Sequence, residues 1–179
     1  MNLRQNYFEL FNLPASPQID QQDLAVRYRE LQRTVHPDRF AAGSDHEQRL
    51  SLQYTTFVNE AYDVLGSDLK RSIYLLKLKG VEISDTEKTT VEPAFLMQQI
   101  ELRETLDDID QAEKPLEELV SMRQHVDSIL VTLISEFKTH LSNESEESLE
   151  LAATVVRKMQ YMYKLIQEID LQEEELLDY

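Results

Sequence analysis

The chain has no cysteine among its 179 residues, and it contains only three glycines and five prolines. The missing cysteine excludes disulfides, thiolate ligands for zinc or iron–sulfur clusters, and cysteine nucleophiles. Scarce glycine and proline disfavour phosphate-cradling loops and sheets with many tight turns, so an all-helical chain is favoured. No stretch reaches the ~18 apolar residues of a membrane helix, and residues 1–20 lack the apolar core of a signal peptide. We therefore expect a cytoplasmic protein.

Positive charge is scarce in one part of the chain only. Residues 1–79 hold ten basic and ten acidic side chains, whereas residues 80–179 hold eight basic and 24 acidic ones. The net charge of −16 therefore belongs to the second part. So acidic a surface repels phosphate, which argues against a nucleic-acid partner. The asymmetry predicts two units with different partners.

The sequence has no pattern typical of an enzyme. The four histidines, at positions 36, 46, 125 and 140, lack the spacing of metal ligands. Adjacent acids such as Asp107 and Asp108 are numerous, but on helices they usually form a solvated face. We expect no metal site, no cofactor and no catalytic residue.

Residues 1–79 are predicted to form four helices in the order short, long, long, short. Asp20 is the expected N-cap of the first long helix, and Pro37 ends that helix because a residue before proline avoids helical backbone. A loop over 36–43 follows. Ser44-Asp45-His46-Glu47 then has the pattern of a capping box, and Gly66 is a natural left-handed helix stop.

The remainder of the chain reads as a polar linker and a bundle. Residues 80–92 lack hydrophobic periodicity, and Pro93 suits the first turn of a helix. Helical segments are expected at about 93–111, 115–141 and 145–176, where apolar residues recur every three or four positions. Short connections favour antiparallel neighbours, so residues 93–179 are predicted to form a three-helix bundle.

The tripeptide His36-Pro37-Asp38 lies in the loop between the two long helices. The proline restricts φ, so the loop presents the histidine and aspartate with little ordering cost on binding. An aspartate there can accept a charge-assisted hydrogen bond from a partner arginine. On the preceding helix Arg29 and Arg33 fall on the outward face, with Arg27 at its flank, and such a face suits an acidic partner surface.

This arrangement resembles the J-domain of DnaJ-type co-chaperones over residues 1–79, with a Tyr7-Phe8 opening and Tyr28 eight residues before His36. The resemblance implies that the chain binds the ATPase and linker region of a DnaK-class chaperone and stimulates its ATP hydrolysis. Glu30 and Ala25 depart from the more basic helix of many J-domains, which suggests a specialised chaperone or a weaker contact. The implied chaperone-binding residues are His36, Pro37, Asp38, Arg27, Tyr28, Arg29 and Arg33.

The helix expected from residue 93 has apolar residues on two sides. On a helical wheel Leu102, Leu106 and Ile109 lie within about 40° of Phe95 and define a core face. Three other apolar residues lie about 100–200° away. This second surface either binds a partner or is buried by a further helix, and the wheel leaves both possibilities open. We call Leu96, Met97 and Ile100 the apolar patch; Glu101 and Glu104 border it, and Tyr161, off the seam of the last helix, can join it.

The stretch FLMQQIELRETLDDIDQA, residues 95–112, resembles the C-terminal domain of the HscB family, the J-domain co-chaperones of bacterial iron–sulfur cluster assembly. The resemblance continues through Arg157-Lys158-Met159 to the end of the chain. It implies that residues 36–38 engage the chaperone HscA, and that the bundle captures the cluster scaffold IscU for delivery to it. ATP hydrolysis by the chaperone then favours cluster release. The implied scaffold-binding residues are Leu96, Met97, Ile100, Glu101, Glu104 and Tyr161.

Two features narrow this resemblance. The chain lacks the Gly/Phe-rich region and the cysteine zinc module of a general DnaJ, so broad binding of unfolded clients is not expected. The J-domain begins almost at Met1, without an added cysteine module, which favours a bacterial cytoplasmic form. A second hypothesis stays open: a J-domain adaptor whose bundle recruits a different client or serves for dimerisation.

Overall fold

The computed structural model describes residues 3–83, 92–143 and 145–177. Within these ranges the regular structure is entirely helical, without a β-strand, as the composition predicts. The chain divides into two compact units, Met1–Leu75 and Leu76–Tyr179. Residues 84–91, most of the predicted linker, lie outside the described ranges, and the expected boundaries at 79 and 92 stay predictions.

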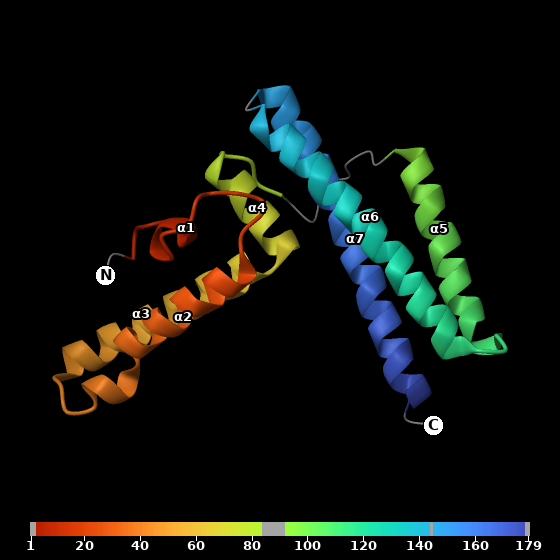
Figure 1. The fold of residues 1–179 in the computed structure, drawn as a ribbon. Coiled ribbons are helices and arrows are strands. Elements are labelled where there is room, and N and C mark those ends of the chain that lie inside the picture. Colours follow the sequence, from red (N-terminus) through yellow and green to blue (C-terminus); the bar gives the residue numbers. More distant parts are fainter. Residues whose placement is uncertain (1–2, 84–91, 144, 178–179) are drawn as a thin grey trace. The chain divides into compact units, whose positions relative to one another are not determined.

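The N-terminal unit is built around a hairpin of two long helices, α2 and α3, which lie side by side (Figure 1). A short helix precedes the hairpin and another follows it, in the predicted order. Its elements are α1 (Tyr7–Leu10), α2 (Gln21–Val35), the 3-10 helix η1 (Pro37–Phe40), α3 (Asp45–Gly66) and most of α4 (Asp68–Leu78), which crosses the division between the units after Leu75.

Local capping explains where the long helices begin. Asp20 Oδ1 accepts hydrogen bonds from the backbone N–H groups of Gln22 at 2.8 Å and Asp23 at 3.2 Å, so it caps α2 as predicted. Ser44 and Glu47 form the predicted reciprocal capping box of α3. The backbone N–H of Ser44 donates to the carboxylate of Glu47 and thereby lowers the pKa of Glu47. Gly66 is the last residue of α3, but its φ is not positive, so the prediction of a left-handed stop there is wrong.

The connection between the long helices differs from the predicted loop in one respect. His36 has the non-helical angles φ −57° and ψ 131°, so α2 ends at Val35 as expected before a proline. Residues Pro37–Phe40, however, close into a 3-10 turn. Proline suits this first position because its φ already has the value that the turn needs. The motif is therefore held by backbone hydrogen bonds.

An arginine is the largest fully buried side chain of the N-terminal unit. Arg71 of α4 is 2% exposed. Its guanidinium donates to the backbone oxygens of Pro17 at 2.9 Å and Leu65 at 2.6 Å, and it pairs with Asp68. The buried charge therefore joins α4 to the end of α3 and to the segment before α2, where apolar packing alone does not satisfy those carbonyl groups.

From residue 92 onward, the described part of the C-terminal unit forms three long helices and one short 3-10 helix, as the bundle prediction requires. Figure 1 shows α6 and α7 side by side, with α5 along the same pair. Their facing positions are buried, among them Val126, Phe137, Val156 and Met159. The elements are α5 (Pro93–Asp108), η2 (Ile109–Gln111), α6 (Pro115–Ser142) and α7 (Glu146–Leu177).

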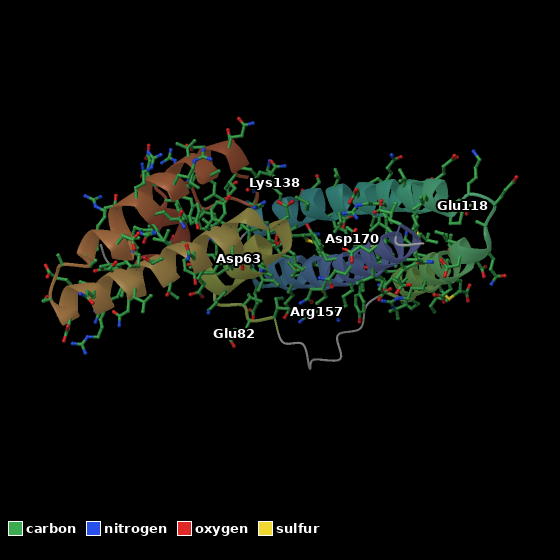
Figure 2. All side chains as sticks on the ribbon, turned by 90° about the horizontal axis from the view of Figure 1, so that it is seen from below. Asp63, Glu82, Glu118, Lys138, Arg157 and Asp170 are labelled. Carbon is green, nitrogen blue, oxygen red and sulfur yellow. The ribbon has the colours of Figure 1, made fainter. Side chains whose placement is uncertain are left out.

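Polar contacts join α5 and α6 separately to α7. Arg103 of α5 donates two hydrogen bonds of 3.2 Å to the carboxylate of Glu168. Arg123 of α6 pairs with Asp170 of α7, which Figure 2 labels. Arg103 therefore marks the side of α5 that faces α7. None of the helices in the described ranges has the length and apolarity that a membrane-spanning segment needs.

Candidate functional site

The 36–38 motif is presented at the surface of the N-terminal unit. His36 is the N-cap of η1, and its Nδ1 accepts a hydrogen bond of 3.3 Å from the backbone N–H of Asp38. The same Nδ1 lies 3.5 Å from a carboxylate oxygen of Asp38. The Asp38 side chain is 91% exposed and that of His36 is 54% exposed. The turn therefore presents an imidazole and a carboxylate at the surface of the unit.

Three arginines gather beside this motif. Arg29, Arg33 and Arg39 are exposed, and together with Gln32 and His36 they line a shallow hollow of about 340 Å³. Arg39 Nη1 donates a 3.0 Å hydrogen bond to the backbone oxygen of Arg33. Neighbouring guanidinium groups favour the binding of carboxylates, because they form directional charge-assisted hydrogen bonds with them. We call these three arginines and His36 the basic hollow.

Arg39 is a residue that the sequence reasoning missed. It directly follows the tripeptide, but an irregular loop does not predict where its side chain lies. The 3-10 turn reverses the chain and returns the Arg39 side chain to the C-terminal end of α2. A turn prediction for the four residues from Pro37 is the signal that could have found it.

Arg27 and Tyr28, two other predicted chaperone contacts, do not line the basic hollow. The Arg27 guanidinium donates to Asp23 at 2.8 Å and to the backbone oxygens of Phe11 and Asn12 at 3.0 Å each. Its hydrogen bond with Asp23 raises the pKa of Arg27. These contacts hold α2 against the end of α1. The role of Arg27 in chaperone binding stays a prediction.

Tyr28 holds the helical hairpin together. Its ring stacks on Tyr62 of α3, with ring centroids 4.0 Å apart and planes at 18°. Its hydroxyl donates a 3.0 Å hydrogen bond to Asn59 Oδ1. Tyr28 therefore orients the helix that carries Arg29 and Arg33, whether or not the ring itself touches a partner.

The apolar patch is exposed. Leu96, Met97 and Ile100 are 42%, 56% and 50% exposed, whereas Phe95 and Leu102 on the other side of α5 are 7% and 9% exposed. The alternative in which another helix buries both faces of α5 is therefore wrong. Glu101 and Glu104 are exposed beside the patch, as the wheel predicts. A cluster of exposed apolar side chains with carboxylates at its edge is typical of a protein-binding surface.

Tyr161 of α7 lies next to the first turn of α5. Its ring meets Phe95 edge to face, with centroids 6.4 Å apart and planes at 62°. Lys158 Nζ lies 5.6 Å from the same Phe95 ring and pairs with Glu92 at 3.1 Å. Tyr161 is partly exposed, and its ring contact is with Phe95 on the buried side of α5, so the place of Tyr161 in the apolar patch stays a prediction.

A buried amide beneath the patch was also missed. Gln99 is 6% exposed, and its Nε2 has no hydrogen-bond partner within the described part of the chain. The helical wheel places Gln99 about 40° from Phe95, so the same calculation could have assigned it to the core face. Composition argues against such an assignment, because amide side chains are seldom buried in a bundle core.

The described residues offer no metal site. Among residues 3–83, 92–143 and 145–177, no three histidine or carboxylate side chains are grouped so that they could hold an ion. Both candidate sites, the basic hollow and the apolar patch, have the composition of surfaces that bind proteins.

Known proteins resemble this chain over nearly its full length. The family model described as the HSCB C-terminal oligomerisation domain matches residues 91–170. The co-chaperone protein HscB homolog of Pseudoalteromonas atlantica is 41% identical, and that of Shewanella amazonensis is 42% identical; each alignment covers 97% of this chain and 99% of the relative.

Solved structures show the same fold. Chaperone HscB from Vibrio cholerae matches with a TM-score of 0.85 at 32% identity, over 96% of this chain and 99% of that one. The human co-chaperone protein HscB matches with a TM-score of 0.86 at 29% identity, over 97% and 84%. The helices thus form the predicted J-domain and C-terminal three-helix bundle, and the chain belongs to the HscB family of co-chaperones.

Proposed function

We propose that this co-chaperone captures the iron–sulfur cluster scaffold IscU and delivers it to the DnaK-type chaperone HscA in the cytoplasm. It stimulates the chaperone's ATPase and so assists transfer of the cluster to acceptor proteins. The observation that carries this proposal is the exposure of Leu96, Met97 and Ile100 on a helix whose other face is buried. The family supplies the co-chaperone role.

The apolar patch has the means to bind a folded protein. Burial of one exposed leucine, isoleucine or methionine side chain contributes about 1–2 kcal/mol, because each of these side chains is already partly covered. Three such side chains form the centre of a small interface. Glu101 and Glu104 at its edge add charge selectivity, which favours a scaffold surface that carries Lys or Arg.

The basic hollow and the 36–38 motif serve the chaperone. His36 and Asp38 have no catalytic role in this function. They bind one conformation of the chaperone more tightly than another, and the chaperone's hydrolysis-competent state gains population by that difference in affinity. The acidic C-terminal unit thus favours a basic partner surface, whereas the arginines of the N-terminal unit favour an acidic one.

The test replaces the patch and leaves the bundle core intact. We expect Leu96→Ala, Met97→Ala and Ile100→Ala together to weaken binding of purified IscU about 100-fold or more in calorimetry. Stimulation of HscA in the absence of scaffold should not change. The matched control replaces three exposed apolar residues elsewhere on the bundle, Val120, Val131 and Leu151, which are 49%, 68% and 46% exposed. Unchanged IscU affinity in the patch variant contradicts the proposal.

The same patch has a second candidate use in self-association. The family model that matches residues 91–170 is described as an oligomerisation domain. Sedimentation of the wild type and of the patch variant without IscU separates the two uses. A dimer that the patch substitutions dissociate favours self-association, whereas a monomer in both cases leaves scaffold binding as the function of the patch.

A further inference from the structure

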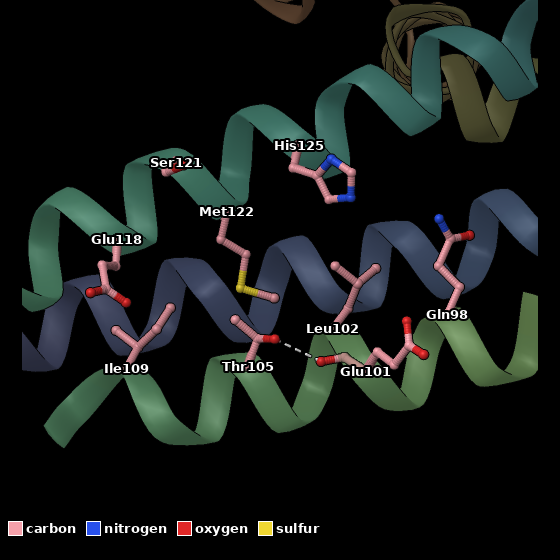
Figure 3. Close-up of a pocket in the computed structure, with 9 residues that line it drawn as sticks. All are labelled: Gln98, Glu101, Leu102, Thr105, Ile109, Glu118, Ser121, Met122 and His125. Atoms are coloured by element: carbon pink, nitrogen blue, oxygen red, sulfur yellow. Dashed lines mark hydrogen bonds between the residues drawn. The ribbon is translucent and has the colours of Figure 1, made fainter. Parts of the chain in front are cut away.

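A groove runs between α5 and α6, on a different side of α5 from its contact with α7 (Figure 3). In the close-up, Leu102 of α5 and Met122 of α6 project into it, with Glu101 and Glu118 from the two helices on either side. A second hollow continues it towards Glu136. Gln98 and Glu101 line both hollows, so the two adjoin. We call these two adjoining hollows together the α5–α6 groove.

The floor of the groove is apolar and its rim is acidic. Leu102, Met122 and Leu133 are 9%, 6% and 5% exposed, and they form part of the floor. Glu101, Glu118 and Glu136 are exposed at the rim. None of the three carboxylates has an ion-pair partner among the described residues. The lining cation is Lys158, whose Nζ already pairs with Glu92.

The apolar floor and the acidic rim together indicate which kind of ligand the groove can bind. Three carboxylates without partners repel an anionic ligand and attract Lys or Arg, while the apolar floor favours aliphatic side chains. Glu118 and Glu136 are 18 positions apart on one helix, which corresponds to about 27 Å. That length accommodates about eight residues of extended chain.

We propose that the α5–α6 groove binds a basic, partly apolar segment of the same scaffold protein that binds the apolar patch. The proposal rests on the proposed function. Its support is continuity, because Met97 of the patch and Glu101 at its border also line the groove. A protein bound to the patch can therefore also contact the adjacent groove. A segment of that protein with Lys or Arg side chains would then lie beside the three carboxylates.

The experiment measures IscU affinity in the full-length chain at about 0.05 M and 0.5 M NaCl. Glu118→Gln with Glu136→Gln removes two charges from the rim, and Ser121→Trp fills the groove. We expect about tenfold weaker binding at low salt from each, and a smaller salt dependence from the double variant. The control Asp127→Asn with Glu150→Gln removes two exposed charges outside the groove and should change affinity less than about twofold.

The outcomes separate this proposal from the function itself. Normal affinity in both groove variants, with weak binding in the patch variant, overturns the groove proposal and leaves the function standing. Normal affinity in the patch variant contradicts the function, and the groove proposal falls with it. An equal loss in the rim and control double variants also overturns the proposal, because it shows a general charge effect. Altered self-association in sedimentation, with normal IscU binding, assigns the groove to a second copy instead.

Discussion

The backbone N–H of Asp38 donates a hydrogen bond to Nδ1 of His36. An Nδ1 atom that accepts leaves the proton of the neutral imidazole on Nε2. The ring is thereby oriented by its own turn, and the half-exposed side chain offers an N–H group to a partner. His36 thus caps η1 and also offers a hydrogen-bond donor at the surface.

We expect the two roles of His36 to separate on mutation. His36→Asn retains a side-chain acceptor that can cap η1, so its melting temperature should stay within about 2 °C of the wild type. His36→Gln should likewise leave the protein folded. Both variants lack the imidazole, and chaperone ATPase stimulation should fall to the basal rate in each. A steady-state ATPase assay checks this, and full stimulation by either variant argues against a role for the ring.

Arg27 and Arg33 should respond differently to alanine substitution. Arg27 is bound to Asp23 and to two backbone oxygens at the end of α1, whereas the Arg33 side chain is exposed in the basic hollow. We therefore expect Arg27→Ala to lower the melting temperature measurably. Arg33→Ala should leave it unchanged and weaken chaperone binding about three- to tenfold. Equal melting temperatures for the two variants contradict the contacts assigned to Arg27.

Leu96 and Leu102 provide a test of the two faces of α5. Leu102 is 9% exposed and Leu96 is 42% exposed. Leu102→Ala should lower the free energy of unfolding by about 2–4 kcal/mol because it leaves a cavity. Leu96→Ala should cost less than about 1 kcal/mol and should weaken IscU binding instead. Urea unfolding and calorimetry on the two variants check both expectations, which a stability loss of similar size would contradict.

Tyr7 should make stability sensitive to alkaline pH. Its hydroxyl donates a 2.7 Å hydrogen bond to Glu60, and burial, followed by this carboxylate, raises the pKa of Tyr7. A raised pKa contributes stability that is complete below the ordinary tyrosine pKa of about 10 and is lost as pH rises towards the higher folded value. Tyr7→Phe should cost about 1 kcal/mol near neutral pH. The difference between the two proteins should shrink above about pH 10.

Urea unfolding between about pH 8 and 11 measures that difference. The pKa of Tyr74 is also raised by burial, and its ring stacks on that of Tyr7, so Tyr74→Phe and the double variant Tyr7→Phe with Tyr74→Phe are measured alongside to separate the two hydroxyls. A difference in unfolding free energy that stays constant up to about pH 11 contradicts the role assigned to the Tyr7–Glu60 pair.

The helices could be predicted because their signals are local. Asp20 and Ser44 cap the helices that they were expected to cap, since a cap involves only the next three residues. Pro37 ends α2 through its effect on one preceding residue. The candidate sites were predicted less completely. Arg39 and Gln99 were missed because their positions depend on a turn and on the partner helices.

The sequence by itself determined the helical class, the starts of the long helices, the neutral and acidic parts, and the two apolar sides of the helix that begins at Pro93. These properties follow from composition and from contacts within one or two turns. Only the tertiary structure decided that the apolar patch is open and that Arg71 is buried. Burial depends on whether another element covers a side chain, and elements that are remote in the chain settle that by packing against one another.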